Sequence, residues 1–353
     1  MHKHNFFAGP SILPQEVYEQ SVEAIRDFAG TGVSILSISH RSKEFSGVME
    51  KARALVKELL HLDDDFEVLF LQGGASMQFL QIPYNLMRSK AAYLDTGTWA
   101  SKAIKESRYF GETVIVASSA GEKYTYIPKD YTVPADADYF HITTNNTIYG
   151  TQMHALPDSP VPLVGDMSSD IFSRELDFNR FGLIYAGAQK NMGPAGTVMV
   201  AVRKSLLGKT GREIPTMMDY QTHINKGSMF NTPPVFAVYV SMLTLEWIKR
   251  KGGVAAMEKI NREKSALLYN ELDGNPLFVT HVRPEDRSMM NVTFDLSDPK
   301  LKERFDAMWQ EAGIVGLKGH RSVGGYRASL YNALPVESVR VLIDVMKELE
   351  RTA

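Results

Sequence analysis

The sequence is 353 residues long and contains no cysteine. Disulfide bonds, zinc–thiolate sites, iron–sulfur clusters and thiol catalysis are therefore excluded, and we expect no metal centre. An excess of basic residues is also lacking: 39 lysines and arginines are balanced by 41 aspartates and glutamates, for a formal net charge of −2. Such a balance does not suit binding to a nucleic-acid backbone, so no nucleic-acid partner is expected.

Long hydrophobic runs are missing as well. No apolar stretch approaches the roughly 18 residues of a membrane span, and residues 1–7 lack the apolar core of a signal peptide. We therefore expect a cytoplasmic protein that makes no membrane contact. Neither G-x-G-x-x-G nor a Walker A motif occurs, so the fingerprints of dinucleotide and nucleoside-triphosphate sites are absent.

The sequence does contain a regular alternation of helix-like and strand-like segments as far as residue 202. The patterns predict helices at 14–29, 45–60, 77–87 and 99–109, and strands at 66–71, 91–94, 113–117, 139–143, 161–165, 183–186 and 197–202. This alternation predicts an α/β domain with a mostly parallel sheet that helices cover on both faces.

The pattern changes after residue 202. The patterns there predict helices at 234–251, 254–272, 299–312 and 335–350, and strands at 278–282, 290–296, 314–317 and 328–331. A chain of this length is expected to form one large domain and one smaller domain. We predict a large domain over residues 1–255, with the option that residues 1–14 pack on the small domain, and a small α+β domain over residues 256–353.

The residues that follow each strand form the candidate site, because ligands of open parallel sheets bind at the carboxyl ends of the strands. Strand 66–71 is followed by Gln72-Gly73-Gly74-Ala75-Ser76 and a helix. Free backbone N–H groups there would suit a phosphate, and a simple turn is the alternative. Strand 91–94 is followed by Trp99, which either fills the core or stacks on an aromatic ligand. Strand 139–143 runs into four small polar residues, 144–147.

Two ionisable residues complete this set. Asp166 follows five apolar residues, and a carboxylate there is costly unless it has a partner such as a protonated ring nitrogen. Lys190 lies among small residues between two apolar strands, and a solvated loop lysine is the alternative. Pyridoxal 5′-phosphate requires a turn that binds its phosphate, an aromatic side chain that stacks on its ring, a carboxylate and a lysine. Lys190 would form the Schiff base, and Asp166 would keep the pyridine nitrogen protonated.

Longer motifs point the same way. The sequence contains Asn5-Phe6-Phe7-Ala8-Gly9-Pro10, Ser39-His40-Arg41-Ser42, Gln72-Gly73-Gly74-Ala75-Ser76, Gly165-Asp166-Met167-Ser168-Ser169, Gly187-Ala188-Gln189-Lys190-Asn191 and Gly319-His320-Arg321-Ser322-Val323-Gly324-Gly325-Tyr326-Arg327-Ala328-Ser329. With these motifs it resembles, essentially end to end, the phosphoserine aminotransferase family, a branch of the class V, fold-type I aminotransferases. The resemblance implies a fold-type I large domain, a smaller α+β C-terminal domain and one pyridoxal 5′-phosphate per subunit.

The resemblance also implies roles for individual residues. Some family members carry an arginine where this sequence has Ala75 and Ser76, so backbone and hydroxyl donors are expected to hold the phosphate here. By this resemblance, Ala75, Ser76 and Gln189 would contact the cofactor's phosphate, and Trp99 would stack on its ring. Thr147 would lie near the phenolic oxygen, Asp166 would pair with the ring nitrogen, and Lys190 would form the Schiff base. Asn231 and Thr232 would complete the phosphate site of the neighbouring subunit, which implies a homodimer.

Two basic clusters suggest an anionic substrate: His40-Arg41, and His320-Arg321 with Arg327. Ordinary solvated arginines are the alternative for any one pair. O-Phosphoserine carries a carboxylate and a phosphate of about −1.5 to −2 charge, and the fork of Arg327 matches the carboxylate. We expect the other four residues to receive the phosphate and, in the second half-reaction, the side-chain carboxylate of glutamate.

The activity that follows is transamination between O-phospho-L-serine and 2-oxoglutarate, giving 3-phosphohydroxypyruvate and L-glutamate in L-serine biosynthesis. 4-Phosphohydroxy-L-threonine, on the pyridoxine route, carries the same charges and is a second expected substrate. A cysteine desulfurase is excluded because the chain has no cysteine. An alanine–glyoxylate or serine–pyruvate aminotransferase would not need the His-Arg pairs, and a phosphometabolite-binding protein with a dead site would have lost Lys190 or Asp166.

Overall fold

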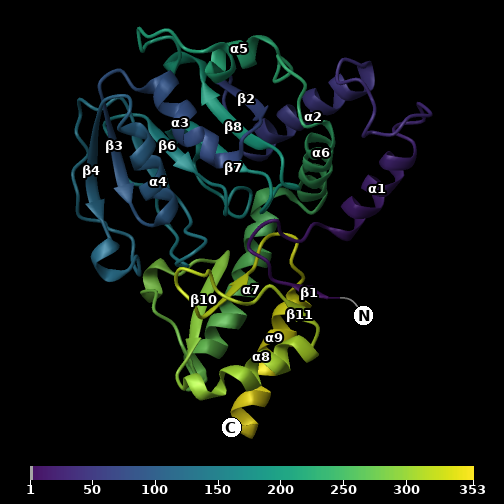
Figure 1. The fold of residues 1–353 in the computed structure, drawn as a ribbon, viewed down its shortest axis with the longest axis vertical. Helices are drawn as coiled ribbons and strands as arrows, with labels where there is room; N and C mark the ends of the chain where they lie inside the picture. The colour runs from purple at the N-terminus through teal and green to yellow at the C-terminus, as the bar shows by residue number, and fades with distance from the viewer. Residues whose placement is uncertain (1–2) are drawn as a thin grey trace.

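The computed structural model describes residues 3–353, so the first two residues of the predicted large domain lie outside it. A seven-stranded sheet in the order β2-β8-β7-β6-β5-β3-β4 forms the centre of the larger part (Figure 1). Its strands are β2 (Phe66–Leu71), β3 (Lys90–Asp95), β4 (Glu112–Ser118), β5 (Phe140–Thr143), β6 (Leu163–Asp166), β7 (Phe181–Gly187) and β8 (Val198–Arg203). Strand β8 is antiparallel to β2 and β7, and the other neighbours are parallel. The predicted α/β architecture with a mostly parallel sheet is confirmed.

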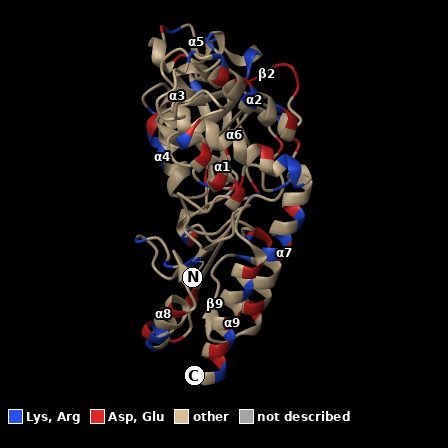
Figure 2. Cartoon of the chain, turned by 90° about the vertical axis from the view of Figure 1, so that its right-hand side faces the viewer, with Lys and Arg blue, Asp and Glu red and all other residues tan. Residues whose placement is uncertain are grey.

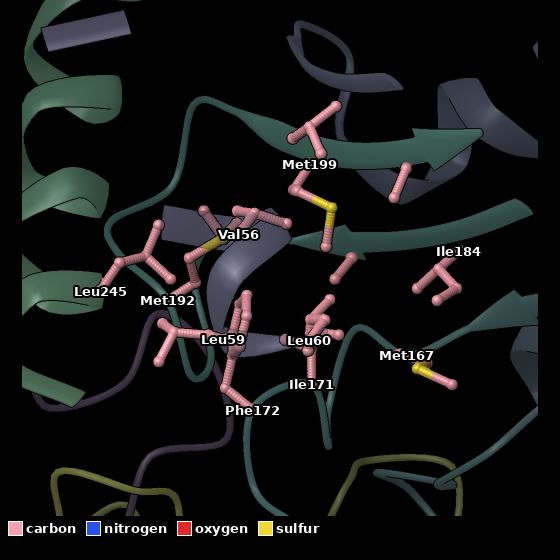
Figure 3. Packing of buried hydrophobic residues seen from close by; sticks show 14 of the residues in the cluster. Val56, Leu59, Leu60, Met167, Ile171, Phe172, Ile184, Met192, Met199 and Leu245 are labelled. Atoms are coloured by element: carbon pink, nitrogen blue, oxygen red, sulfur yellow. The ribbon is translucent and has the colours of Figure 1, made fainter. Parts of the chain in front are cut away.

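Helices cover both faces of this sheet (Figure 1). The helices of the larger part are α1 (Gln15–Arg26), which packs on α6, α2 (Lys43–Leu59), α3 (Gly74–Leu86), α4 (Thr98–Ser107), α5 (Tyr220–Asn225) and α6 (Val235–Arg250). Residues alternate along β2, β3, β6, β7 and β8 between two apolar clusters, because successive side chains of a strand point to opposite faces. In β7, Ile184 belongs to the cluster that includes α2 and α6, whereas Tyr185 belongs to the cluster that includes α3 and α4. Figure 3 shows part of the first cluster, in which Val56 and Leu59 of α2 lie between Leu245 of α6 and Ile184 of β7 in this view.

A smaller part follows along the chain (Figure 1). It contains α7 (Gly253–Gly274), α8 (Lys302–Glu311), α9 (Val336–Thr352) and a three-stranded antiparallel sheet of β9 (Phe278–Val279), β10 (Asn291–Leu296) and β12 (Tyr326–Ser329). Strand β1 (His4–Asn5) pairs with β11 (Ile314–Val315), and Phe6 lies in the apolar cluster of this part. Helix α7 contacts α6 as well as α9 and β10. The predicted division after residue 255 falls inside α7 and stays a prediction.

Some predicted boundaries were wrong. Helix α3 begins at Gly74, three residues before the predicted start, because the turn at Gly73 already leads into the helix. Strand β12 covers residues 326–329 instead of 328–331, because its pairing with β10 runs from Phe294↔Tyr326 to Asn291↔Ser329. The predicted strand at 278–282 is only two residues long, and the short helix α5 had no predicted counterpart. These differences come from pairing and turn geometry, which local patterns do not contain.

Charged residues of both signs are interspersed along α7 and α9 (Figure 2). Within residues 3–353 there is no helix with the length and apolar character required to cross a bilayer.

Candidate active site

A cavity of about 180 Å³ opens at the carboxyl ends of the sheet strands. It is lined by small and polar residues from the ends of β2, β3, β5, β6 and β7 and from the segments that follow them. The lining residues are Gly73, Gly74, Ala75, Ser76, Trp99, Thr143, Asn145, Thr147, Asp166, Ser168, Ser169, Gln189 and Lys190. Seven residues predicted from the sequence are therefore together in one cavity: Ala75, Ser76, Trp99, Thr147, Asp166, Gln189 and Lys190.

The N-terminus of α3 forms one wall of the cavity. Gly73 precedes the helix with a φ of 86°, in the left-handed region that glycine tolerates best, and no side chain from the described residues caps this end. A Cβ added at Gly73 would lie 2.6 Å from Cβ of Met77. The turn therefore requires glycine, and it leaves the first backbone N–H groups of a 13-residue helix facing the cavity, where the helix dipole favours an anion.

Trp99 is the second residue of α4, and its ring forms another wall. Its indole Nε1 is buried and has no hydrogen-bond partner within residues 3–353. The ammonium of Lys102, one helical turn later, lies 4.5 Å from the centre of the ring. Lys102 is thus a cation against the Trp99 ring that the sequence analysis did not single out, although its spacing of three residues from Trp99 on a helix was a usable signal.

Asp166 is the last residue of β6 and is 5% exposed. Its Oδ1 accepts a hydrogen bond of 3.0 Å from the Ser168 backbone N–H. Burial raises the pKa of Asp166, and the nearby charge of Lys190 acts in the opposite direction. A carboxyl group in this position is ready to pair with a cation in the cavity, because a positive partner would offset its desolvation.

Lys190 lies three residues beyond the end of β7 and is partly buried. Its Nζ donates a 2.6 Å hydrogen bond to the Thr147 hydroxyl. Burial lowers the pKa of Lys190 to about 8. The N-terminal segment holds this turn in place, because the Ser11 N–H donates to the Gln189 carbonyl at 2.9 Å and the Ser11 hydroxyl donates to the Lys190 carbonyl. The alternative of a solvated loop lysine is therefore wrong.

The predicted substrate residues fall into two groups. In β12, Arg327 donates from Nη1 to the Thr147 carbonyl at 3.2 Å, and its Nε is buried without a partner in the described chain. The pKa of the nearby His320 is lowered by burial and then by the positive charges of Arg327, Arg321 and Lys102. The three cations Arg327, Arg321 and Lys102 therefore lie around the imidazole of His320, and Arg327 links this group to Thr147.

His40 and Arg41 are not among the residues that line the cavity, and they precede α2 with the Arg41 side chain exposed. Asn231 and Thr232 do not line it either. The Gln72 side chain donates to the Thr232 carbonyl at 2.7 Å, and Asn231 lines a neighbouring hollow of about 310 Å³ that shares Gly73 with the cavity. Within one chain these two residues lie behind the glycine turn, so the prediction that they complete a neighbour's site stays a prediction.

The sequence analysis did not assign roles to Thr143, Asn145, Ser168 and Ser169, which also line the cavity. Each of them ends a parallel strand or follows one within three residues, so the rule that ligands bind at strand ends, which already pointed to the segment 144–147 with Asn145, covers the other three as well.

Comparisons with known proteins agree with this geometry. Residues 4–342 match the family model described as aminotransferase class-V. The phosphoserine aminotransferase of Flavobacterium johnsoniae is 64% identical over 353 residues, covering 99% of both chains. The chain belongs to the class V aminotransferase family.

Solved structures of this family superpose closely on the chain. Phosphoserine aminotransferase from Bacillus circulans gives a TM-score of 0.96 at 43% identity, covering 99% of both chains. The PLP-bound phosphoserine aminotransferase from Trichomonas vaginalis superposes with a TM-score of 0.93 at 36% identity. The match covers 98% of this chain and 100% of the Trichomonas vaginalis chain. The class V aminotransferase is therefore a fold-type I enzyme, and its cofactor is pyridoxal phosphate.

The residues of the cavity fit this cofactor. The uncapped helix end suits a phosphate, the buried carboxyl group of Asp166 suits a ring nitrogen, and the amine of Lys190 suits an aldehyde. The Thr143 hydroxyl is another buried polar atom that has no partner within residues 3–353. Buried polar atoms are normally hydrogen-bonded, so these free groups are expected to face a polar ligand.

Proposed function

We propose that this class V aminotransferase transfers an amino group between O-phospho-L-serine and 2-oxoglutarate, forming 3-phosphohydroxypyruvate and L-glutamate. The observation that carries the proposal is the guanidinium of Arg327, which bonds Thr147 as Lys190 does and is accompanied by the cations Arg321 and Lys102 near His320. Burial and three positive charges lower the pKa of His320, and no carboxylate is among the causes of this shift. A cluster of uncompensated cations attracts a substrate that carries both a carboxylate and a phosphate.

The chain's own residues would position the substrate and move protons. Bound pyridoxal phosphate supplies an electron sink for the electron pair released at the substrate's α-carbon. Lys190 has a pKa of about 8, so a fraction of its amine is neutral near neutral pH and can take a proton and return it. The Thr147 hydroxyl, 2.6 Å from Nζ, orients that amine, and the carboxyl group of Asp166 would hold a proton on the cofactor's ring nitrogen.

Arg327 would hold the substrate's α-carboxylate. Its hydrogen bond to the Thr147 carbonyl fixes the guanidinium beside Lys190 and leaves the buried Nε–H for a carboxylate oxygen. His320 and Arg321, with His40 and Arg41, would then hold the phosphate. The exposed side chain of Arg41 can change its position, so we assign to it the exchange between the phosphate and the side-chain carboxylate of glutamate.

A homodimer is part of the same proposal. Met77 and Met217, which line the hollow beside Asn231, and Phe230, which precedes Asn231 in the chain, are each more than a third exposed in the single chain. Exposed apolar groups that cluster in this way are typical of an interface. A partner that covered this face would place its own Asn231 and Thr232 close to the glycine turn at Gly73. We also propose that the enzyme acts in L-serine biosynthesis and that it uses 4-phosphohydroxy-L-threonine in pyridoxine biosynthesis. Its proposed location is the cytoplasm.

The visible absorbance of the loaded enzyme tests this function. We expect O-phosphoserine to bleach the yellow band and 2-oxoglutarate to restore it, whereas alanine leaves it unchanged. Lys190→Ala, which lacks the amine, should not show the cycle. A band that responds equally to alanine and phosphoserine would contradict the proposed substrate and favour another class V activity.

A further inference from the structure

Two buried polar residues lie behind Asp166, and the mechanism above does not use them. Tyr185 of β7 is the register partner of Asp166 in β6. Directly paired residues of neighbouring strands project from the same face of the sheet, so the phenol and the carboxylate are neighbours. Burial raises the pKa of Tyr185 well above its usual value, and the negative charge of Asp166 acts in the same direction.

His141 of β5 lies on the other side of this phenol. Its Nε2 is 2.9 Å from the Tyr185 hydroxyl oxygen, and both side chains are at most 1% exposed. The ring of Tyr93 stacks on the imidazole, with centroids 5.0 Å apart and 25° between the planes. Burial lowers the pKa of His141 to about 3, so the imidazole is neutral near neutral pH.

The protons of these groups determine which of them donates. A neutral imidazole has one N–H donor, and a phenol has one O–H donor that can serve only one acceptor at a time. If Nε2 carries the imidazole proton, it donates to the phenol oxygen, and the phenol proton is then directed to the carboxylate. The opposite arrangement would leave the buried carboxylate of Asp166 with the Ser168 donors alone.

Asp166 needs such a donor. Burial favours its neutral form, and the two charged groups that act on it, Lys190 and Asp170, do so in opposite directions. A neutral Asp166 could not hold a proton on a ring nitrogen, whereas each hydrogen bond donated to its oxygens favours the ionised form.

We propose that Tyr185 and His141 are positioning residues that keep Asp166 ionised opposite the cofactor's ring nitrogen, through hydrogen bonds from His141 Nε2–H to the Tyr185 hydroxyl and from that hydroxyl to the carboxylate. This inference rests on the role proposed for Asp166 and is independent of the identity of the amino-acid substrate. It goes beyond the packing role of Tyr185, whose ring also belongs to the apolar cluster on α3 and α4.

The direct test is the ¹⁵N chemical shift of pyridoxal phosphate, labelled at the ring nitrogen and bound to the enzyme, measured as a function of pH. Tyr185→Phe keeps the ring and removes the donor. We expect the ring nitrogen to lose its proton about one pH unit lower than in the unmodified enzyme, and the cofactor to dissociate about tenfold more readily. Tyr139→Phe is the matched control, because that hydroxyl is equally buried and bonds to Tyr93. It should leave the titration unchanged.

Variants of His141 test the hydrogen bond between His141 and Tyr185, which lies one step further from Asp166. His141→Phe keeps the stack on Tyr93 but has no N–H, and it should shift the titration in the same direction as Tyr185→Phe. His141→Gln retains an N–H donor, so its ring-nitrogen titration should lie close to that of the unmodified enzyme. These two variants also test the proposal if Tyr185→Phe does not fold.

An unchanged titration in folded Tyr185→Phe, or in folded His141→Phe, would overturn the proposal. Asp166→Asn separates this failure from a failure of the proposed function. If Asp166→Asn itself leaves the ring nitrogen protonated, the role of Asp166 is wrong and the inference falls with it. If the titrations shift as expected but phosphoserine does not bleach the loaded enzyme, the inference stands and the substrate assignment is wrong.

Discussion

Lys190 illustrates how a residue's surroundings decide its chemistry. The same side chain in a solvated loop would remain an ammonium ion with a pKa near 10.4. Here burial of the side chain lowers the pKa to about 8. The hydrogen bond to Thr147 then fixes the direction of the amine.

The first prediction concerns the pH dependence of cofactor loading. Only the neutral amine of Lys190 attacks an aldehyde, and it becomes populated as the pH rises through the pKa of about 8. The rate at which the apoprotein forms the yellow band with pyridoxal phosphate should therefore rise with pH, with a midpoint near 8. Stopped-flow absorbance over a pH series measures it. A midpoint near that of a free lysine would contradict the burial argument.

Arg327→Lys is the second prediction at this scale. Lysine keeps the positive charge but cannot bond the Thr147 carbonyl and a carboxylate at once in the fork geometry. We expect KM for both phosphoserine and glutamate to rise about tenfold or more, with a smaller change in kcat. Steady-state kinetics measure the split. Arg26→Lys, at an exposed pair with Glu23, is the control, and equal effects of the two variants would refute the assigned role.

At the scale of elements, the turn into α3 shows what patterns can and cannot locate. The strand β2 and an approximate helix were predicted because apolar residues repeat at the spacing of each element. The first turn of the helix was missed, because Gly74, Ala75 and Ser76 carry no apolar repeat. What starts the helix there is the left-handed backbone of Gly73 and the close packing of Met77 against it.

Gly73→Ala is the prediction for this element. The added Cβ would meet Met77 at 2.6 Å and would occupy a φ of 86°, so the turn must shift. We expect a loss of about 1–3 kcal/mol in unfolding free energy and weaker cofactor binding, because the N–H groups of the helix end move with the turn. Chemical denaturation and absorbance titration with pyridoxal phosphate measure these effects. Gly121→Ala, where a Cβ meets nothing within 4 Å, should change neither; a similar loss there would contradict the explanation.

At the scale of the whole molecule, the proposed homodimer explains why some predicted residues are absent from the cavity. Asn231 and Thr232 lie behind the glycine turn of their own chain and beside exposed apolar side chains. Two copies related by a twofold axis would present the same surface to each other, so each copy could supply residues to the other's site.

Mixing two inactive variants tests this arrangement. In a hybrid of Lys190→Ala and Asn231→Ala subunits, one site has its own Lys190 and receives Asn231 from the partner. Random exchange of equal amounts makes about half of the dimers hybrid, so activity should recover to about a quarter of the unmodified level. Activity after mixing, with each variant alone as the control, measures it. No recovery despite exchange would show that Asn231 acts within its own chain.

The sequence by itself determined the α/β class, the strand cores and the residues at the strand ends, because these follow from local apolar periodicity and from the rule that parallel strands bring their carboxyl ends together. Seven of the predicted site residues share a cavity for this reason. The contacts that tune them were decided only by the tertiary structure. Thr147 binds Lys190 from 43 residues away and Arg327 from 180 residues away. Such contacts depend on how distant segments pack, and it is packing, through burial, that lowers the pKa of Lys190 and raises that of Asp166.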